Sequence, residues 1–171
     1  MLNDRVQERL NEQIRHELQS AYIYFGMAAH FEAISLKGFA NWMTVQAQEE
    51  LTHAYRIFNY INDRGGRAVL KALDAPPLEW KSPLAAVTNA YEHECKVSQS
   101  INECVSLALD EKDHMTNTFL QWFVAEQVEE EATADDLVQK LKLIGDNASG
   151  LFLLDNELSK RTFAPEAESS G

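Results

Sequence analysis

Apolar residues recur every three or four positions along four long segments of the chain, at about 4–33, 37–64, 83–112 and 115–144. This spacing gathers the apolar side chains on one face of an α-helix, so it predicts four long helices that pack as a bundle. A shorter amphipathic segment follows Ser149 and carries Leu151, Leu154 and Leu158 on one side. We expect this segment to form a fifth, C-terminal helix. The predicted fold class is therefore all-α.

Residues that begin and end helices stand at the borders of these segments. Asn3 can cap the first helix, and Ser82 followed by Pro83 is typical of a helix start. Gly65 and Gly145 are placed where the second and fourth helices should stop. The local sequence therefore supports the borders that the apolar pattern indicates.

The connections between the segments predict how the helices are arranged. Short links near 35–37 and 113–114 make the flanking helices antiparallel neighbours. The link at 67–82 has sixteen residues, which reach roughly 50 Å when extended, whereas a helix of about 28 residues is about 42 Å long. This link can run the length of the bundle and make the second and third helices parallel. Its larger apolar residues should pack along the outside, namely Leu70, Leu73, Leu78 and Trp80.

The charge of the chain excludes some classes of partner. Fifteen Lys and Arg residues against 27 Asp and Glu residues give a net charge of −12 over 171 residues, and such a surface repels nucleic acid. We find no run of about 18 apolar residues and no apolar signal segment after Met1. We therefore expect a cytoplasmic protein without nucleic-acid or membrane partners, with one domain at 1–161 and a flexible acidic tail at 162–171.

Polar side chains interrupt the apolar stripes near the middle of each long helix. Buried carboxylates are costly and repel one another, and no Lys or Arg occupies these stripes to balance them. The alternative is that they are surface residues assigned to the wrong face, which would require the same error at matching depth in four helices. The interrupting residues are Glu17 in the first segment, Glu50 and His53 in the second, Glu94 in the third, and Gln127 and Glu130 in the fourth.

Bound cations would resolve this conflict of charge. Four carboxylates carry a charge of −4, which two divalent ions neutralise. Glu50 and His53 are three residues apart, so both project from one helix face toward one ion. Oxygen ligands with a single imidazole suit iron(II) or manganese(II) better than a metal that prefers thiolates. The interrupted stripes therefore predict a metal centre inside the bundle.

The two metal positions are expected to be unequal. Bundles that hold two iron ions typically use one Glu from each of two helices and Glu-x-x-His from each of the other two. Here the fourth helix offers Gln127-x-x-Glu130 instead. A weakly held second ion suits iron that leaves after oxidation. The fuller shell would be Glu17, Glu50 and His53, and the poorer one Glu50, Glu94 and Glu130.

The chain resembles bacterial non-haem ferritins from about residue 10 to residue 159. The specific stretches are AQEELTH at 47–53, EHE at 92–94 and FLQWFVAEQVEEE at 119–131. The resemblance implies a ferritin-like four-helix bundle with one long crossover between the second and third helices and a short fifth helix. It also implies a homo-oligomeric hollow shell of two dozen subunits, which oxidises iron(II) with O2 or H2O2 and stores a hydrated ferric oxide.

The same resemblance implies roles for individual residues. Glu17, Glu50 and His53 match the first iron site, and Glu50, Glu94 and Glu130 match the second, with Gln127 beside it. A third iron site would use Glu49, Glu126, Glu129 and Glu130. Tyr24 matches a redox-active tyrosine, and Trp122 matches an aromatic residue close to the iron centre. Leu51 stands where haem-binding bacterioferritins carry a methionine, so haem is not expected at that position.

Other interpretations remain open from the residues alone. Tyr24 could be an ordinary core residue, and the off-stripe glutamates at 49, 126 and 129 could form a solvated helix face. A second functional hypothesis is a di-iron oxidase or a rubrerythrin-like peroxidase, although the chain has no Cys-x-x-Cys pair for a rubredoxin module. A third is a metal-free helical interaction protein, which the unbalanced carboxylates disfavour. The short fifth helix is too apolar for a free tail and is expected to form a contact between subunits.

Overall fold

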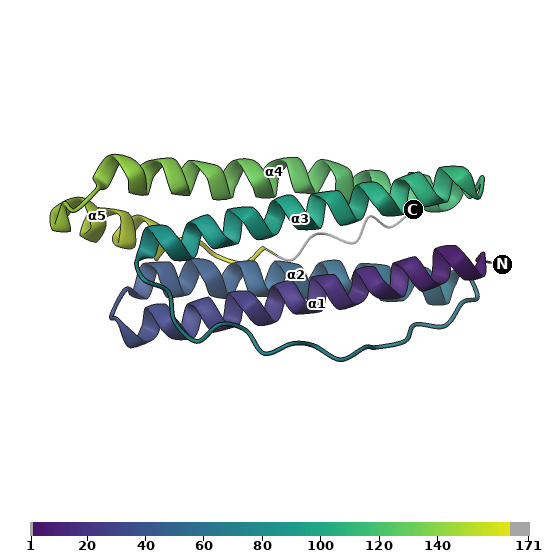
Figure 1. Cartoon of the computed structure of the whole chain (residues 1–171), viewed down its shortest axis with the longest axis horizontal. Coiled ribbons are helices and arrows are strands. Elements are labelled where there is room, and N and C mark those ends of the chain that lie inside the picture. The colour runs from purple at the N-terminus through teal and green to yellow at the C-terminus, as the bar shows by residue number, and fades with distance from the viewer. Residues whose placement is uncertain (1, 165–171) are drawn as a thin grey trace.

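The computed structural model describes residues 2–164, and within that range the chain forms five helices. The first four lie side by side and α5 packs across one end of them (Figure 1). The predicted all-α fold is confirmed, and each border of the four long helices lies within two residues of the predicted one. The helices are α1 (Asp4–Ala33), α2 (Lys37–Asp63), α3 (Pro83–Asp110), α4 (His114–Ile144) and α5 (Ala148–Leu158).

The predicted domain at 1–161 and flexible tail at 162–171 stay predictions. Residues 162–164 continue as coil, and 165–171 lie outside the described range. Among the residues that are described, no helix is long and apolar enough to cross a membrane.

Local side-chain chemistry explains where most helices begin. The Asn3 side chain accepts hydrogen bonds from the backbone N–H groups of Arg5 and Val6, and Ser82 accepts one from Ala85. Gly145 ends α4 with φ at +54°, a conformation that glycine adopts without strain. The predicted starts and stops at these positions are confirmed.

The start of α2 depends instead on a distant residue. No side chain caps α2 at Leu36. Asp155 of α5 supplies the acceptor, because its Oδ1 atom lies 2.8 Å from the backbone nitrogen of Gly38 and 3.0 Å from that of Phe39. A Cβ atom at position 38 would lie 1.6 Å from the Asp155 carbonyl oxygen, so only glycine allows this close approach. The negative charge of the Asp155 carboxylate is also stabilised by the positive N-terminal end of the α2 dipole.

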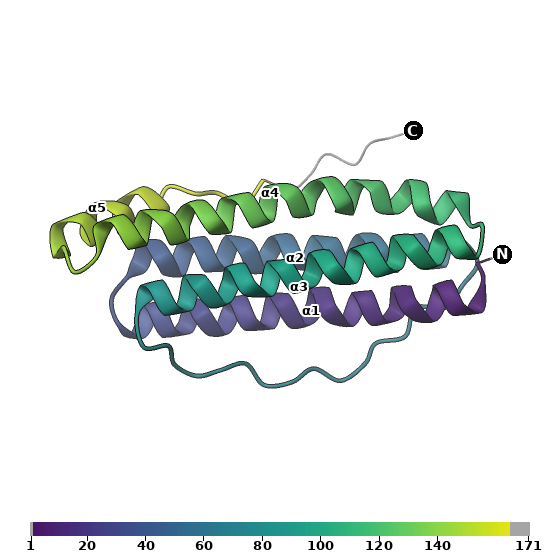
Figure 2. The same cartoon turned by 45° about the horizontal axis from the view of Figure 1, so that its top comes forward.

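The connection between α2 and α3 runs along the whole bundle, so that these two helices are parallel (Figures 1 and 2). The predicted topology is therefore confirmed. The predicted apolar packing of the connection is wrong for its leucines, because Leu70 and Leu78 are 66% and 87% exposed and Leu73 is exposed as well. Of the four large apolar residues of the connection, Trp80 packs against the hydrophobic core.

Side-chain amides of α1 hold this connection in place of apolar contacts. The Asn11 amide donates to the Arg67 carbonyl at 3.1 Å and accepts from the Val69 N–H at 2.8 Å. Gln19 makes the same pair of bonds to the backbone of Asp74. An extended segment without a partner strand exposes backbone donors and acceptors, and an amide side chain satisfies one of each. The leucines are consequently free to face solvent.

The apolar core is divided into two clusters along the bundle. One lies toward α5 and includes Phe31, Phe39 and Leu154. The other lies toward the opposite end and includes Ile14 and Ile57. The buried polar residues that interrupt the stripes lie between them. The fold thus places a polar layer at mid-height inside an otherwise apolar bundle.

Candidate metal centre

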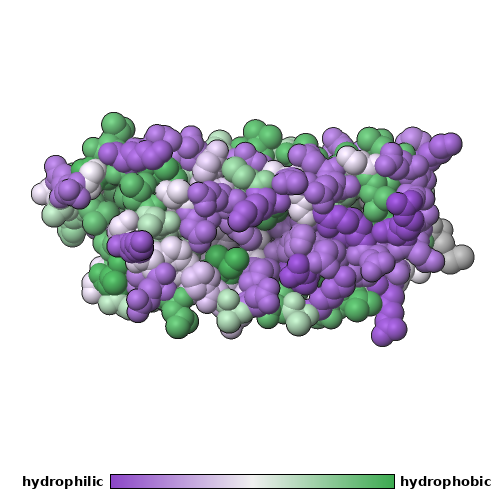
Figure 3. All heavy atoms as spheres, viewed as in Figure 1, coloured by the Kyte–Doolittle hydropathy of each residue, from purple (hydrophilic) through white to green (hydrophobic). Residues whose placement is uncertain are grey.

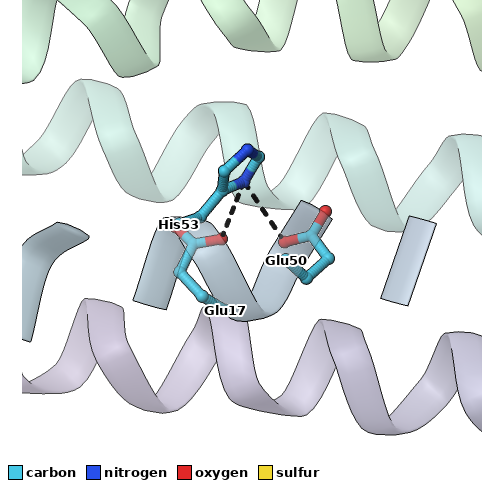
Figure 4. A group of neighbouring side chains, drawn as sticks. All are labelled: Glu17, Glu50 and His53. Carbon is cyan, nitrogen blue, oxygen red and sulfur yellow. Dashed lines mark ion pairs between the residues drawn. The ribbon is translucent and has the colours of Figure 1, made fainter. Parts of the chain in front are cut away.

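Three potential metal ligands converge from two helices at the centre of the bundle. Glu17 comes from α1, and Glu50 and His53 come from successive turns of α2 (Figure 4). The Nδ1 atom of His53 lies 3.6 Å from Glu50 Oε2 and 3.9 Å from Glu17 Oε2. One ligand atom from each residue lies within 4.8 Å of the other two. All three side chains are buried. The structure therefore brings together the residues predicted for the first iron site.

Three of the four carboxylate oxygens of this group have no hydrogen-bond partner within residues 2–164. Glu17 Oε1 accepts from Gln13 at 2.8 Å, but Glu17 Oε2 and both carboxylate oxygens of Glu50 are buried without a partner. A buried carboxylate oxygen without a partner costs several kcal/mol. A divalent cation between these oxygens and the His53 nitrogen would remove that cost, and the oxygen-rich donor set suits iron(II).

A second group of potential metal ligands also includes His53. It joins His53 to Glu126 and Glu130 of α4, again with one atom of each within 4.8 Å of the others. The resemblance to bacterial non-haem ferritins implies a role for Glu126 only at the third site. Its spacing of four residues from Glu130 was the available signal, because such residues lie on the same face of a helix. The structure thus positions Glu126 as a further candidate ligand beside His53.

Glu94 lies in the same polar layer but belongs to neither converging group. It is fully buried. One of its carboxylate oxygens accepts a hydrogen bond from the Tyr24 hydroxyl, and the other accepts from the Gln127 side chain at 3.2 Å. The Gln127 amide also donates to the backbone carbonyl of Glu94 at 3.3 Å. Both oxygens of Glu94 are therefore engaged by neutral donors from α1 and α4.

Burial raises the pKa values of the acidic groups in this layer. It raises the pKa of Glu94 to about 8, and the nearby charge of Glu130 acts in the same direction. Burial, followed by the charges of Glu94 and Glu17, raises the pKa of Glu50 well above its usual range. The pKa of Glu130 is also raised by burial, against a hydrogen bond that it accepts from Gln46 at 2.8 Å. The site therefore holds protons that an arriving cation would displace.

Two aromatic residues border the centre. Tyr24 is fully buried, and burial together with the charge of Glu94 raises the pKa of its phenol well above 10, so that the hydroxyl stays protonated and donates to Glu94. Trp122 meets the His53 ring edge-on, with 5.4 Å between ring centroids. Both side chains thus lie beside candidate ligands, Tyr24 beside Glu94 and Trp122 beside His53.

The residues predicted for a third site are brought together only in part. Glu49 is half-buried, and its Oε2 atom pairs with Arg161 at 2.6 Å. Burial raises the pKa of Glu49, and the charge of Glu126 contributes in the same direction, which places these two carboxylates in one electrostatic environment. Glu129 is exposed and belongs to neither converging group. Leu51, at the position considered for haem, is 41% exposed.

Comparison with known proteins agrees with this arrangement. Residues 7–144 match the model of the ferritin-like domain of the ferritin family. The chain belongs to the ferritin family. Its relatives include bacterial non-haem ferritins from Bacteroides fragilis, 43% identical, and from Staphylococcus aureus, 40% identical. The matches cover 94% and 97% of this chain and all of each relative.

Solved ferritin structures share both the fold and the sequence. A closed form of the Archaeoglobus fulgidus ferritin, engineered by mutagenesis, is 54% identical with a TM-score of 0.95, and the match covers 96% of this chain and all of that one. The open-pore ferritin from the same archaeon is 53% identical with a TM-score of 0.94, over 95% of this chain and all of that one. Family membership together with the converging Glu17, Glu50 and His53 identifies the chain as an iron-storage ferritin with a di-iron ferroxidase site.

Proposed function

We propose that Glu17, Glu50 and His53 bind the first iron(II) ion and that Glu50, Glu94 and Glu130 bind the second, with Gln127 beside it. Glu126 lies beside His53 and Glu130 and would border both the second position and the third site. The observation that carries the proposal is the set of buried carboxylate oxygens of Glu17 and Glu50 without hydrogen-bond partners in the described chain. Iron(II) is the substrate, and O2 or H2O2 is the electron acceptor.

The residues of the site support this reaction by their charge and position. Two iron(II) ions release two electrons, which with two protons reduce O2 to H2O2, or H2O2 to two molecules of water. The carboxylates hold both ions in one buried layer and lower the energy of the more highly charged iron(III) product. Displaced protons leave when the ions bind, because the acidic groups there have raised pKa values. The Gln127 amide positions the Glu94 carboxylate through its hydrogen bond.

We propose further that the chain assembles into a hollow shell of 24 subunits in the cytoplasm, and stores the oxidised iron there as a hydrated ferric oxide. Large apolar side chains remain exposed on α5, including Phe152 and Leu153 at 65% and 68%. Apolar side chains also gather on the face shown at the α5 end of the molecule (Figure 3). Such an apolar end suits burial against neighbouring subunits.

Gel filtration combined with iron loading tests this proposal. The assembled protein should elute as a particle of several hundred kilodaltons and should retain iron in that particle after aerobic addition of iron(II). A small particle that consumes H2O2 but retains no iron would instead favour the di-iron oxidase or rubrerythrin-like peroxidase. The unmodified protein without iron is the control for the elution volume.

Tyr24 is proposed to supply an electron during oxygen reduction, and the Tyr24→Phe substitution tests it. Complete reduction of O2 to water requires four electrons, of which two iron ions supply two. A third iron near Glu49, Glu126 and Glu129 could supply one more, and the phenol of Tyr24 the fourth. Phenylalanine retains the ring but removes the hydroxyl that donates to Glu94. We expect more H2O2 released per iron oxidised, measured with a peroxide-specific electrode. Equal peroxide yields and equal rates would make Tyr24 a core residue only.

A further inference from the structure

The segment that follows α5 turns back along the bundle and is fastened to α2 (Figure 1). The side-chain amide of Asn41 donates to the backbone carbonyls of Leu158 at 3.1 Å, Ser159 at 3.4 Å and Arg161 at 2.9 Å. One amide group of α2 therefore holds the last turn of α5 and the residues after it. This contact fixes the backbone from which the Arg161 side chain extends.

Arg161 places its guanidinium group beside the carboxylates at the edge of the metal centre. Its Nη2 atom lies 2.6 Å from Glu49 Oε2, and the guanidinium carbon lies 4.8 Å from the centre of the Trp42 ring. The Nη1 atom is buried and has no hydrogen-bond partner in the described chain. The ion pair with Glu49 therefore uses one guanidinium nitrogen rather than two. A cation–π contact with the Trp42 ring holds the guanidinium in place.

The positive charge of Arg161 affects the pKa of Glu130 as well as that of Glu49. The pKa of Glu49 is raised first by burial, and Arg161 opposes that increase. The pKa of Glu130 is likewise raised overall, because burial outweighs the opposing effects. These include the hydrogen bond from Gln46 and the positive charge of Arg161. The guanidinium thus lies in the electrostatic environment of the carboxylates at the α2–α4 edge of the metal centre.

We propose that Arg161 is a built-in competitor for the third iron position, occupying the Glu49 carboxylate with a guanidinium that an iron ion must displace. This inference rests on the proposed role of Glu49, Glu126 and Glu129 in a third site. A guanidinium carries one positive charge, whereas iron(II) carries two and accepts several oxygen ligands at once. The third ion therefore binds more weakly than the first two, and only when enough iron is present to displace Arg161. In this way the segment after α5, through Arg161, sets the affinity of the third iron position.

Metal-binding titrations of the assembled protein test this role without using oxidation activity. Zinc(II) is the probe, because it is redox-inert, and its binding is followed by isothermal titration calorimetry. In Arg161→Gln we expect the third zinc ion per subunit to bind about fivefold more tightly or better, with the first two unchanged. Lys160→Gln is the matched control, since it removes the same charge from the neighbouring exposed residue. Arg161→Lys, which retains the charge, should bind the third ion as the unmodified protein does.

Two further measurements separate this inference from the proposed function. In the double variant with Arg161→Gln and Glu49→Gln, the third zinc ion should no longer bind more tightly, because the Glu49 carboxylate that Arg161→Gln frees is then missing. Anomalous scattering from zinc-soaked crystals should show higher zinc occupancy at Glu49 in Arg161→Gln than in the unmodified protein. An unchanged third affinity, or an equal gain in Lys160→Gln, would overturn the inference. Failure of the first two zinc ions to bind would contradict the proposed function instead, while the occupancy at Glu49 still decides the role of Arg161.

Discussion

Replacing Glu50 by alanine is expected to abolish rapid oxidation of iron(II), with a decrease in initial rate of at least about 100-fold. Glu50 is the residue assigned to both iron ions, and both of its oxygens are buried without a hydrogen-bond partner among residues 2–164. Its loss removes a ligand from each position and leaves His53 with one fewer carboxylate nearby. Stopped-flow absorbance of the ferric product under air measures the rate.

A matched control distinguishes loss of the site from loss of the fold. Gln48 lies two residues earlier on α2 and is exposed, so Gln48→Ala should retain the rate of the unmodified protein. Gel filtration should show that Glu50→Ala still assembles, because the substitution removes a carboxylate that its neighbours repel. Initial rates in Glu50→Ala equal to those of the unmodified protein would contradict the assignment of Glu50 to both ions.

Glu94 should make the stability of the metal-free protein depend strongly on pH. Burial raises its pKa from 4.5 to about 8 in the folded chain, so the folded state binds this proton more readily than the unfolded state. The resulting stabilisation is fully present below the unfolded value and is lost as the pH rises through the folded value. We therefore expect the melting temperature of chelator-treated protein to decrease between about pH 5 and about pH 9.

The Glu94→Gln variant tests the origin of this dependence. Glutamine cannot ionise, and its carbonyl oxygen can still accept from the Tyr24 hydroxyl, so the decrease in melting temperature should become shallower. Some dependence should remain, because Glu50 and Glu130 also have raised pKa values. Glu92→Gln, on the exposed surface of the same helix, is the control and should melt as the unmodified protein does. If Glu94→Gln has the same pH profile as the unmodified protein, the buried proton belongs to another group.

The helices and the first iron site were predictable because their signals are local. Helix borders follow from the apolar period and from caps such as Ser82, which lie within a few residues of the backbone they satisfy. Glu50 and His53 are one turn apart on α2, so their convergence follows from helix geometry alone. Glu17 is predicted as a ligand because a carboxylate buried in an apolar stripe needs a positive charge or a metal ion to balance it.

The remaining features depend on contacts that no local pattern records. Leu70 and Leu78 suggested apolar packing, but the connection is held by amides of α1, which the apolar pattern does not include. The place of Glu126 beside His53 depends on side-chain conformations across two helices. Arg161 follows the last helix, where periodicity carries no information, and it reaches Glu49 only because the chain turns back.

The cap that Asp155 provides for α2 has a consequence for the order of events during synthesis. The ribosome synthesises the chain from its N-terminus, so α2 emerges well before Asp155, which accepts hydrogen bonds from the first backbone N–H groups of α2. A nascent chain ending before α5 would carry an α2 helix with a frayed first turn. Completion of the first turn of α2 therefore waits for the last portion of the chain to be translated.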